Sequence, residues 1–190
     1  MAARRKKKRP LNSRRTKAEL MDAARWLVTR HGYDGVGARD MAARAGYDPV
    51  LLRRYFGSKQ GIFEAAIRGV FDAKPLLVDA GAPLAARLAR TVLEPTRVRP
   101  DSDPILLAVR AAASDDVRKA VALGLEREFI QPLAEELGAR GRDGAQARAA
   151  AALAILAGFD LVHTVLGIEV LNRPQGRQLL LTLLKLCLDE

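Results

Sequence analysis

The stretch that decides the fold covers residues 41–59 and reads MAARAGYDPVLLRRYFGSK. Its first five residues form helices readily, and Gly46 can take the left-handed conformation that ends a helix. Asp48 offers an N-cap carboxylate, and Pro49 occupies the first helical position, where proline is tolerated best. A second, short helix has room only between Pro49 and Gly57. Two helices joined by a turn of roughly three to four residues form a helix-turn-helix unit, whose second helix can lie in the major groove of DNA.

The second helix of this unit is too short to be stable alone, since isolated helices below roughly 12–15 residues are marginal. Packing must hold it, and the expected anchors are Leu52, Tyr55 and Phe56. The opposite face then points outward and carries Val50, Arg53 and Arg54, with Leu51 at its edge. Arginine is the usual bidentate reader of guanine, and an apolar side chain can contact a thymine methyl group. The alternative is that both arginines belong only to a solvated face.

Candidate contacts to the DNA backbone flank this short helix. Lys59 lies at the N-terminus of the next expected helix, where free amide groups favour a phosphate. The Tyr55 hydroxyl and the Arg39 guanidinium are secondary candidates. The predicted DNA-binding set is Arg39, Asp48, Pro49, Val50, Leu51, Arg53, Arg54, Tyr55 and Lys59.

The net charge of +10 is concentrated at the N-terminus. Residues 1–17 carry nine Lys or Arg and no acidic residue, whereas residues 61–190 have a local charge of −1. A chain that binds polyanions through one end is the simplest interpretation. Residues 1–15 are expected to form a disordered arm that follows phosphates or enters the minor groove; the alternative is a solubilising tail. The basic residues of this arm are Arg4, Arg5, Lys6, Lys7, Lys8, Arg9, Arg14 and Arg15.

Composition excludes several other classes. With 190 residues, 49% of them hydrophobic, the chain can form one domain or two small ones. Its one cysteine, Cys187, fits a reducing cytoplasm. The longest apolar region, residues 149–170, is interrupted by Asp160, His163 and Glu169, which argues against a membrane span. We therefore expect a cytoplasmic protein without membrane contact.

The chain shows helical rather than strand-like periodicity throughout. Thr16 and Glu19 are spaced as a capping box, which predicts that the first helix begins at residue 16. Helices are then expected at 37–45, 49–55, 59–74, 84–93, 104–113, 115–137 with a kink at Pro132, 145–171 and 178–188. Ser114 and Asp143 are expected N-caps. The prediction is an all-α protein of about nine helices, with a three-helix head at residues 16–60 and a helical body at 61–190.

Between residues 16 and 66 the chain resembles the DNA-binding domain of TetR-family (tetracycline-repressor-like) transcriptional regulators. The matching residues are Ala23-Ala24, His31-Gly32-Tyr33, Arg39-Asp40-Met41-Ala42, Ala45-Gly46, Asp48-Pro49 and Tyr55-Phe56-Gly57-Ser58-Lys59. The resemblance implies an all-α homodimer with a DNA-binding head and a larger body for ligand binding and dimerisation. It implies phosphate contacts for Tyr55 and Lys59. Gly37, Leu51 and Arg53 depart from the family's usual residues, so the target DNA sequence does not carry over.

The two last expected helices, 145–171 and 178–188, are apolar around most of their circumference and must be buried on several sides. A two-fold dimer in which they form a four-helix bundle solves this, and the resemblance implies the same arrangement. An unknown small-molecule effector is expected to bind in the body. Its predicted pocket residues are Phe71, Leu107, Arg110, Phe129, Phe159 and His163.

Asp160 and His163 lie on one face of the apolar helix. A metal or catalytic pair needs further ligands or a nucleophile, and the sequence has only one other histidine. We therefore expect no metal and no cofactor, and interpret the pair as polar registry at the dimer interface or as a hydrogen bond in the pocket. The overall prediction is a dimeric repressor released from a palindromic DNA operator by an effector. The alternatives are an architectural DNA-binding protein without an effector, and a helical-bundle enzyme, for which the sequence shows no phosphate loop or activated nucleophile.

Overall fold

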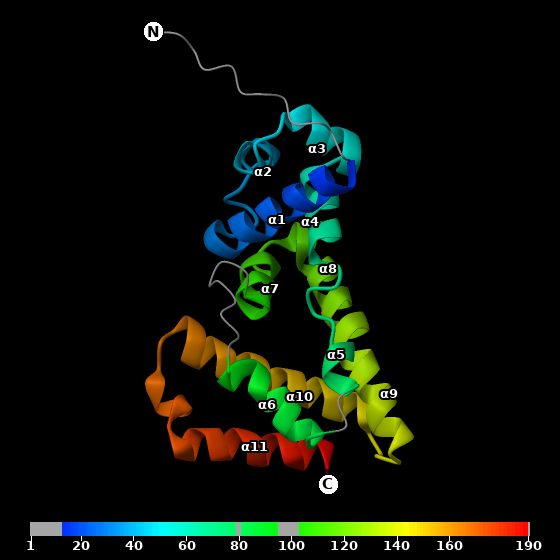
Figure 1. The fold of residues 1–190 in the computed structure, drawn as a ribbon, viewed down its shortest axis with the longest axis vertical. Helices are drawn as coiled ribbons and strands as arrows, with labels where there is room; N and C mark the ends of the chain where they lie inside the picture. Colours follow the sequence, from blue (N-terminus) through cyan, green and yellow to red (C-terminus); the bar gives the residue numbers. More distant parts are fainter. Residues whose placement is uncertain (1–12, 79–80, 95–102, 190) are drawn as a thin grey trace.

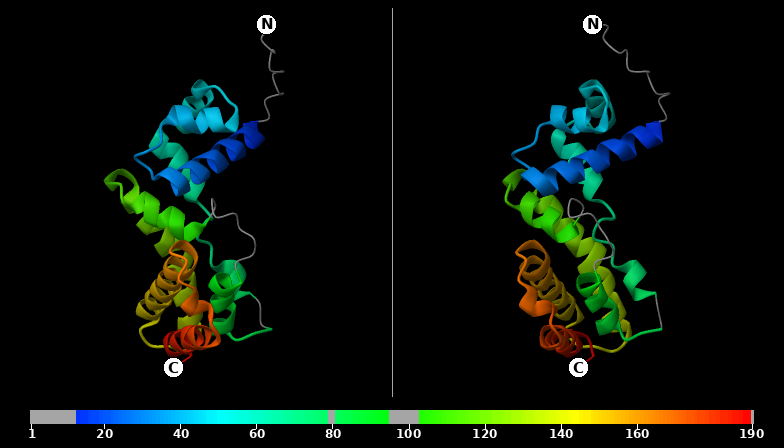
Figure 2. Two further views of the ribbon diagram at one scale, coloured as in Figure 1. Left: turned by 90° about the vertical axis from the view of Figure 1, so that its left-hand side faces the viewer. Right: turned by 60° about the vertical axis from the view of Figure 1, so that its left-hand side comes forward.

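The computed structural model describes residues 13–78, 81–94 and 103–189, and all regular secondary structure in these ranges is helical. The predicted all-α fold is confirmed. Figure 1 shows an elongated molecule with α1 to α4 at one end and α6, α10 and α11 at the other. The ribbon that carries α8 and α9 runs along one side and joins the two ends, as the turned views of Figure 2 also show.

The elements of the head are α1 (Ser13–His31), α2 (Ala38–Ala45), α3 (Pro49–Phe56) and α4 (Lys59–Ile67). The body contains α5 (Lys74–Leu77), α6 (Leu84–Leu93), α7 (Pro104–Ala112), α8 (Asp115–Leu125), α9 (Gln131–Ala139), α10 (Ala145–Asp160) and α11 (Pro174–Leu188). Two π-helical segments, η2 (Glu126–Ile130) and η3 (Leu161–Val165), follow α8 and α10, and a 3-10 helix, η4 (Glu169–Asn172), precedes α11.

The local signals of the helix-turn-helix unit are confirmed. Gly46 has φ 77° after α2, and its N–H donates to the carbonyls of Ala42 and Ala43. The Asp48 carboxylate accepts from the Val50 N–H at 2.8 Å, and Pro49 is the first residue of α3. These contacts join residues at most four apart, which is why sequence reasoning recovers them.

The prediction of a capping box at the start of α1 is wrong. The helix begins at Ser13, three residues before Thr16, whose side chain is buried inside it. Glu19 instead accepts from the Arg15 Nε at 2.8 Å within α1 and, as a tertiary contact, from the Tyr47 hydroxyl. Because Tyr47 belongs to the turn between α2 and α3, Glu19 ties α1 to that turn.

The helix expected at 59–74 is interrupted, because α4 ends at Ile67. Gly69 follows with φ 75°, and the Arg25 Nη1 donates to the Ala66 carbonyl at 2.6 Å. The Glu128 carboxylate accepts from the N–H groups of Gly69 at 2.8 Å and Phe71 at 3.1 Å. Side chains from α1 and η2 thus satisfy backbone groups that a continuous helix would have satisfied itself.

Three expectations for the body also need correction. Ser114 is the N-cap residue of α8 as predicted, but its hydroxyl donates to Asp34 at 2.8 Å rather than accepting from the helix. Gly144, with φ 64°, precedes α10 in place of an Asp143 cap. The long apolar helix ends in η3 before Gly167, which has φ 70°, and does not reach residue 171.

Two separate hydrophobic cores organise the described residues. The first joins α1 to α4 with α7 and the start of α8, through residues such as Leu20, Leu107 and Val121. The second joins α5, α6, η2 and α9 to α11, through residues such as Leu133 and Leu184. The head core therefore includes α7 and part of α8, both of which the sequence assigned to the body. Among the described residues, only the continuous path α8–η2–α9 contributes buried residues to both cores within one helical run.

Among the described residues, one stretch is long and apolar enough to cross a membrane, the 21 residues Ala145–Val165. Length and composition alone qualify it, and a core helix of a folded domain meets the same criterion. In this structure α10 packs against α9 and α11, and its last residue, Asp160, is buried. Only 28% of this apolar window is buried within the single chain, so packing against α9 and α11 accounts for part of its apolar composition.

Candidate DNA-binding surface and ligand cavity

The outward face of α3 carries the side chains that the sequence assigned to base reading. Val50 is 69% exposed, and Arg53 and Arg54 are exposed as well. Leu52 is 1% exposed and anchors the helix in the head core, while Tyr55 and Phe56 pack half-buried against that core. Figure 1 places α3 at the far end of the head, away from the body. The helix therefore presents two guanidinium groups and one apolar side chain to an approaching surface.

The predicted phosphate contacts come from α2, α3 and α4. Arg39 is exposed in the first turn of α2, and Tyr55 is half-buried with the Lys17 Nζ 5.4 Å from its ring centroid. The Lys59 Nζ lies 3.9 Å from the ring centroid of Tyr33. That cation–π contact holds the ammonium at the start of α4, where the free helix amides also favour an anion.

The basic arm is only partly described. Arg14 and Arg15 lie in the first turn of α1 rather than in an extended segment, and Arg15 forms an ion pair with Glu19 at 2.8 Å. The other basic residues of the predicted arm lie outside the described residues, and they are Arg4, Arg5, Lys6, Lys7, Lys8 and Arg9. Any arm that precedes the head therefore consists of residues before Ser13.

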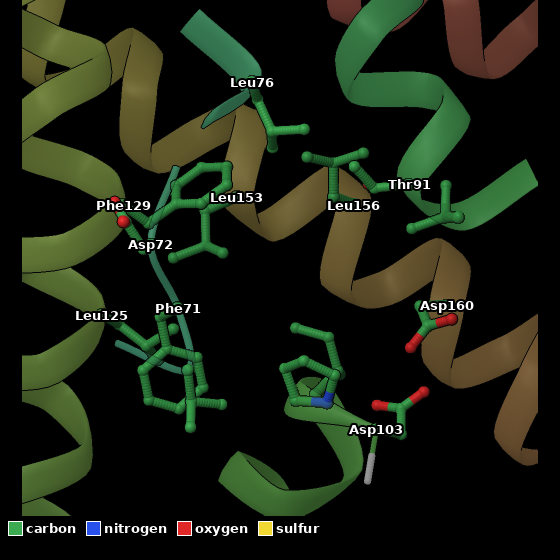
Figure 3. Close-up of a pocket in the computed structure, with 14 residues that line it drawn as sticks. Phe71, Asp72, Leu76, Thr91, Asp103, Leu125, Phe129, Leu153, Leu156 and Asp160 are labelled. Carbon is green, nitrogen blue, oxygen red and sulfur yellow. The ribbon is translucent and has the colours of Figure 1, made fainter. Parts of the chain in front are cut away.

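A cavity of about 250 Å³ lies in the body beside the break between α4 and α5 (Figure 3). Its lining comes from that break and from α5, α6, α8, η2 and α10, as well as from the start of α7. The lining residues are Val70, Phe71, Asp72, Leu76, Thr91, Val92, Asp103, Pro104, Ile105, Leu125, Phe129, Leu153, Leu156 and Asp160. Both hydrophobic cores contribute to this lining, since Phe71 belongs to the head core and Phe129 to the body core.

Two of the six predicted pocket residues, Phe71 and Phe129, line this cavity. The other four do not. Leu107 is buried in the head core, and Arg110 is exposed on α7. Phe159 is buried in the body core, with its ring centroid 6.0 Å from that of His163, whose Nδ1 is buried without a hydrogen-bond partner. Helical periodicity cannot separate a side chain that faces a cavity from one that faces a core.

Sequence reasoning gave Asp160 a hydrogen bond in the pocket as one of two alternatives, and it missed Asp72 and Asp103 of the cavity wall. Asp160 is only 7% exposed, and burial raises the pKa of its carboxyl, with Asp103 raising it further while Thr164 and His163 act in the opposite direction. Asp103 precedes α7 and accepts from the Leu106 N–H at 2.8 Å. The available signal was Asp160 itself, because an acidic residue inside an otherwise apolar helix is rarely buried without a role. Among the described residues no cluster of three or more metal-ligating side chains occurs.

An exposed recognition helix on a helix-turn-helix head, joined to a helical body, defines a DNA-binding transcriptional regulator. Family models agree with this class. One for bacterial regulatory proteins of the tetR family matches residues 20–66, and one for the tetracyclin repressor-like C-terminal domain matches residues 82–184. The chain belongs to the TetR family of transcriptional regulators.

Solved structures with the same fold include GusR from Salmonella enterica, with a TM-score of 0.72 and 20% identity over 95% of this chain and 98% of that one. NalD, the secondary repressor of the MexAB-OprM multidrug efflux pump in Pseudomonas aeruginosa, has a TM-score of 0.69 and 15% identity over 93% and 98%. SmeT in complex with triclosan has a TM-score of 0.67 and 20% identity over 90% of each chain. At these identities the likeness establishes the fold. No curated protein matches the sequence.

Proposed function

We propose that this protein is a cytoplasmic, homodimeric repressor that binds a palindromic operator and is released from it by a small-molecule effector. The observation that carries this proposal is the position of the cavity. It lies where the break between α4 and α5 meets η2, so a bound molecule contacts segments that belong to both hydrophobic cores. A ligand that binds better to one relative placement of the cores shifts the population toward that placement.

Glu128 supports a direct coupling between cavity and head. Its carboxylate holds the backbone of Gly69 and Phe71, and the Ala73 N–H donates to its carbonyl at 2.9 Å. Its neighbour Phe129 lines the cavity, as does Phe71. A molecule that displaces either ring therefore acts on the segment directly after α4, and α4 packs against α1 in the head.

Exposed side chains on the last helices support a dimer. On α11 the residues Leu179, Leu183 and Leu186 are exposed at helical spacing. One exposed face of α10 carries only small residues, and they are Ala147, Ala151, Ala154 and Gly158. A second copy that places its α10 and α11 on this face forms a four-helix bundle, in which the small residues let backbones approach closely. The two α3 helices of such a dimer would be set to read two half-sites roughly 34–36 Å apart.

The relatives add support for an effector and for repression. NalD is a repressor of an efflux pump, and SmeT forms a complex with triclosan. Both have this fold over at least 90% of the present chain. The cavity in the body is therefore a reasonable place for an effector in this protein.

Operator binding can be tested with the full chain and DNA from upstream of its own gene. A labelled fragment and a shuffled fragment of equal length are titrated at physiological salt. A regulator is expected to prefer one site by roughly 10³-fold or more. Equal affinities would favour the architectural alternative, in which the basic arm binds any DNA. A shift of the preferred fragment back to the free state by a cavity-binding compound would then test release.

A further inference from the structure

The cavity in the body has apolar walls, three carboxyl groups and one hydroxyl group. Ten of its fourteen lining residues are apolar, and the other four are Asp72, Thr91, Asp103 and Asp160. No lysine, arginine or histidine is among the described residues that line it. A molecule inside therefore meets apolar contacts and hydrogen-bond acceptors, three of which carry negative charge when ionised.

Two of the three carboxyl groups face each other. Figure 3 shows Asp103 and Asp160 close together at one end of the cavity, while Asp72 lies at the other end beside Phe129. The Asp72 carboxylate accepts from the Lys74 N–H at 3.0 Å, and one oxygen of Asp103 accepts from the Leu106 N–H. Asp160 caps no helix. Among the described side chains, no lysine or arginine forms an ion pair with Asp103 or Asp160.

This arrangement is costly for the empty protein. A buried carboxylate loses hydration, and a second carboxylate beside it adds repulsion, so the pair tends to retain a proton. Burial and Asp103 raise the pKa of Asp160, while the Thr164 hydroxyl and the His163 ring on η3 lower it. A cation placed between the two carboxyl groups would relieve both penalties and replace the proton.

We infer that the cavity selects an apolar molecule with one positive charge, whose cationic nitrogen lies between Asp103 and Asp160. The apolar part then lies against the rings of Phe71 and Phe129, on the opposite side of the cavity. A neutral molecule leaves the carboxyl pair uncompensated, and an anion adds a third like charge. The inference rests on the proposed function only in that this molecule would be the effector.

Three probes that share a naphthalene ring test the charge preference: 1-naphthylmethylamine, 1-naphthylmethanol and 1-naphthoate. Each is titrated into the full-length protein at pH 7 without DNA, and binding is followed by naphthalene fluorescence and calorimetry. The amine is expected to bind about tenfold or more tightly than the alcohol, because hydrogen bonds to charged groups are stronger than neutral ones. The naphthoate should bind more weakly than the alcohol. Calorimetry in buffers of different ionisation enthalpy should show proton release with the amine only.

Matched variants locate the preference. Asp160→Asn should bring the amine and the alcohol to about equal affinity, since the amide keeps the shape but not the charge. Asp103→Asn should reduce the preference and retain an acceptor for the Leu106 N–H. Asp143→Asn is the control, because Asp143 is an exposed loop carboxylate outside the cavity lining. Circular dichroism confirms that each variant is folded.

Several outcomes overturn the inference: no probe binds, the alcohol or naphthoate binds as tightly as the amine, or Asp160→Asn keeps the full preference. None of these outcomes bears on DNA binding by the head. If instead the amine binds with the expected preference but leaves operator affinity unchanged, the charge selectivity stands and the proposed release by effector fails.

Discussion

Arg53 and Arg54 are exposed on a helix of eight residues that is anchored by the buried Leu52. Replacing Arg53 by Ala should weaken operator binding by roughly 1–3 kcal/mol, the discrimination of one good arginine–guanine pair. Binding to shuffled DNA should change much less. Both affinities are measured by fluorescence anisotropy at one salt concentration, with Arg140→Ala on the body as control. An equal loss on both DNAs would identify Arg53 as a phosphate contact.

Asp160 makes stability depend on pH in a defined direction. Its pKa is raised by burial, so the folded protein holds the proton more tightly than the unfolded chain does. The carboxyl therefore costs stability as the pH rises from the usual aspartate pKa, about 3.9, through the raised value. Asp160→Asn, which cannot ionise, should melt at a higher temperature than the wild type at pH 7. The difference should shrink as the pH falls toward about 4, and the same advantage at both pH values would contradict this account.

At the scale of elements, the break between α4 and α5 is held from a distance. The Arg25 side chain of α1 donates to a carbonyl at the end of α4, and the Glu128 carboxylate of η2 accepts from the N–H groups of Gly69 and Phe71. The backbone of this segment lacks helical hydrogen bonds and forms hydrogen bonds with these two side chains instead. Glu128 lies in the middle of the π-helical segment η2, and its carboxylate faces this break.

Glu128→Ala should cost roughly 1.5–3 kcal/mol of unfolding free energy, the usual value for hydrogen bonds to a charged group. Urea unfolding measures this loss. Glu126→Ala is the matched control, because Glu126 is exposed in the same π-helical segment. Glu128→Ala should also weaken the effect of a cavity ligand on DNA binding, since the side chain that joins η2 to the α4–α5 break is gone. If a cavity ligand affects DNA binding as strongly in this variant as in the wild type, other contacts couple the cavity to the head.

At the scale of the whole molecule, the apolar face of α10 and α11 is exposed in the single chain, and a second copy would bury it. Leu183→Glu places a charge among Leu179 and Leu186 and should shift the protein to monomers in sedimentation analysis. Operator affinity should fall with it, because one head then binds one half-site. Leu123→Glu, an exposed leucine on α8, is the control and should leave the dimer intact. A dimer that survives Leu183→Glu would place the interface elsewhere.

The basic arm belongs to the same scale, since it works through total charge. The structure places Arg14 and Arg15 on α1, so the deletion that tests the arm ends at residue 12. Removing residues 1–12 should lower affinity for all DNA and flatten the salt dependence by about 0.9 for each phosphate that the arm no longer neutralises. Affinities are measured between about 50 and 200 mM salt. An unchanged slope would make the arm a passive tail.

Much of the head followed from the sequence by itself, because its signals are local. Gly46, Asp48 and Pro49 define the turn and the start of α3 through contacts within a few residues, and the spacing around Leu52 determines which face is exposed. The same spacing could not choose among the aromatic residues of the body. Phe71 and Phe129 line the cavity, whereas Phe159 is in the core.

Only the tertiary structure decided where α4 ends and what lines the cavity. Glu128 lies 59 residues from Gly69 along the chain, and Asp103 and Asp160 come from different elements. Helical periodicity predicts which face of a helix is buried. It does not predict which residues of other segments pack against that face. Hydrogen bonds and charge pairs between distant segments depend on those residues. In this protein they determine the coupling segment and the carboxyl pair.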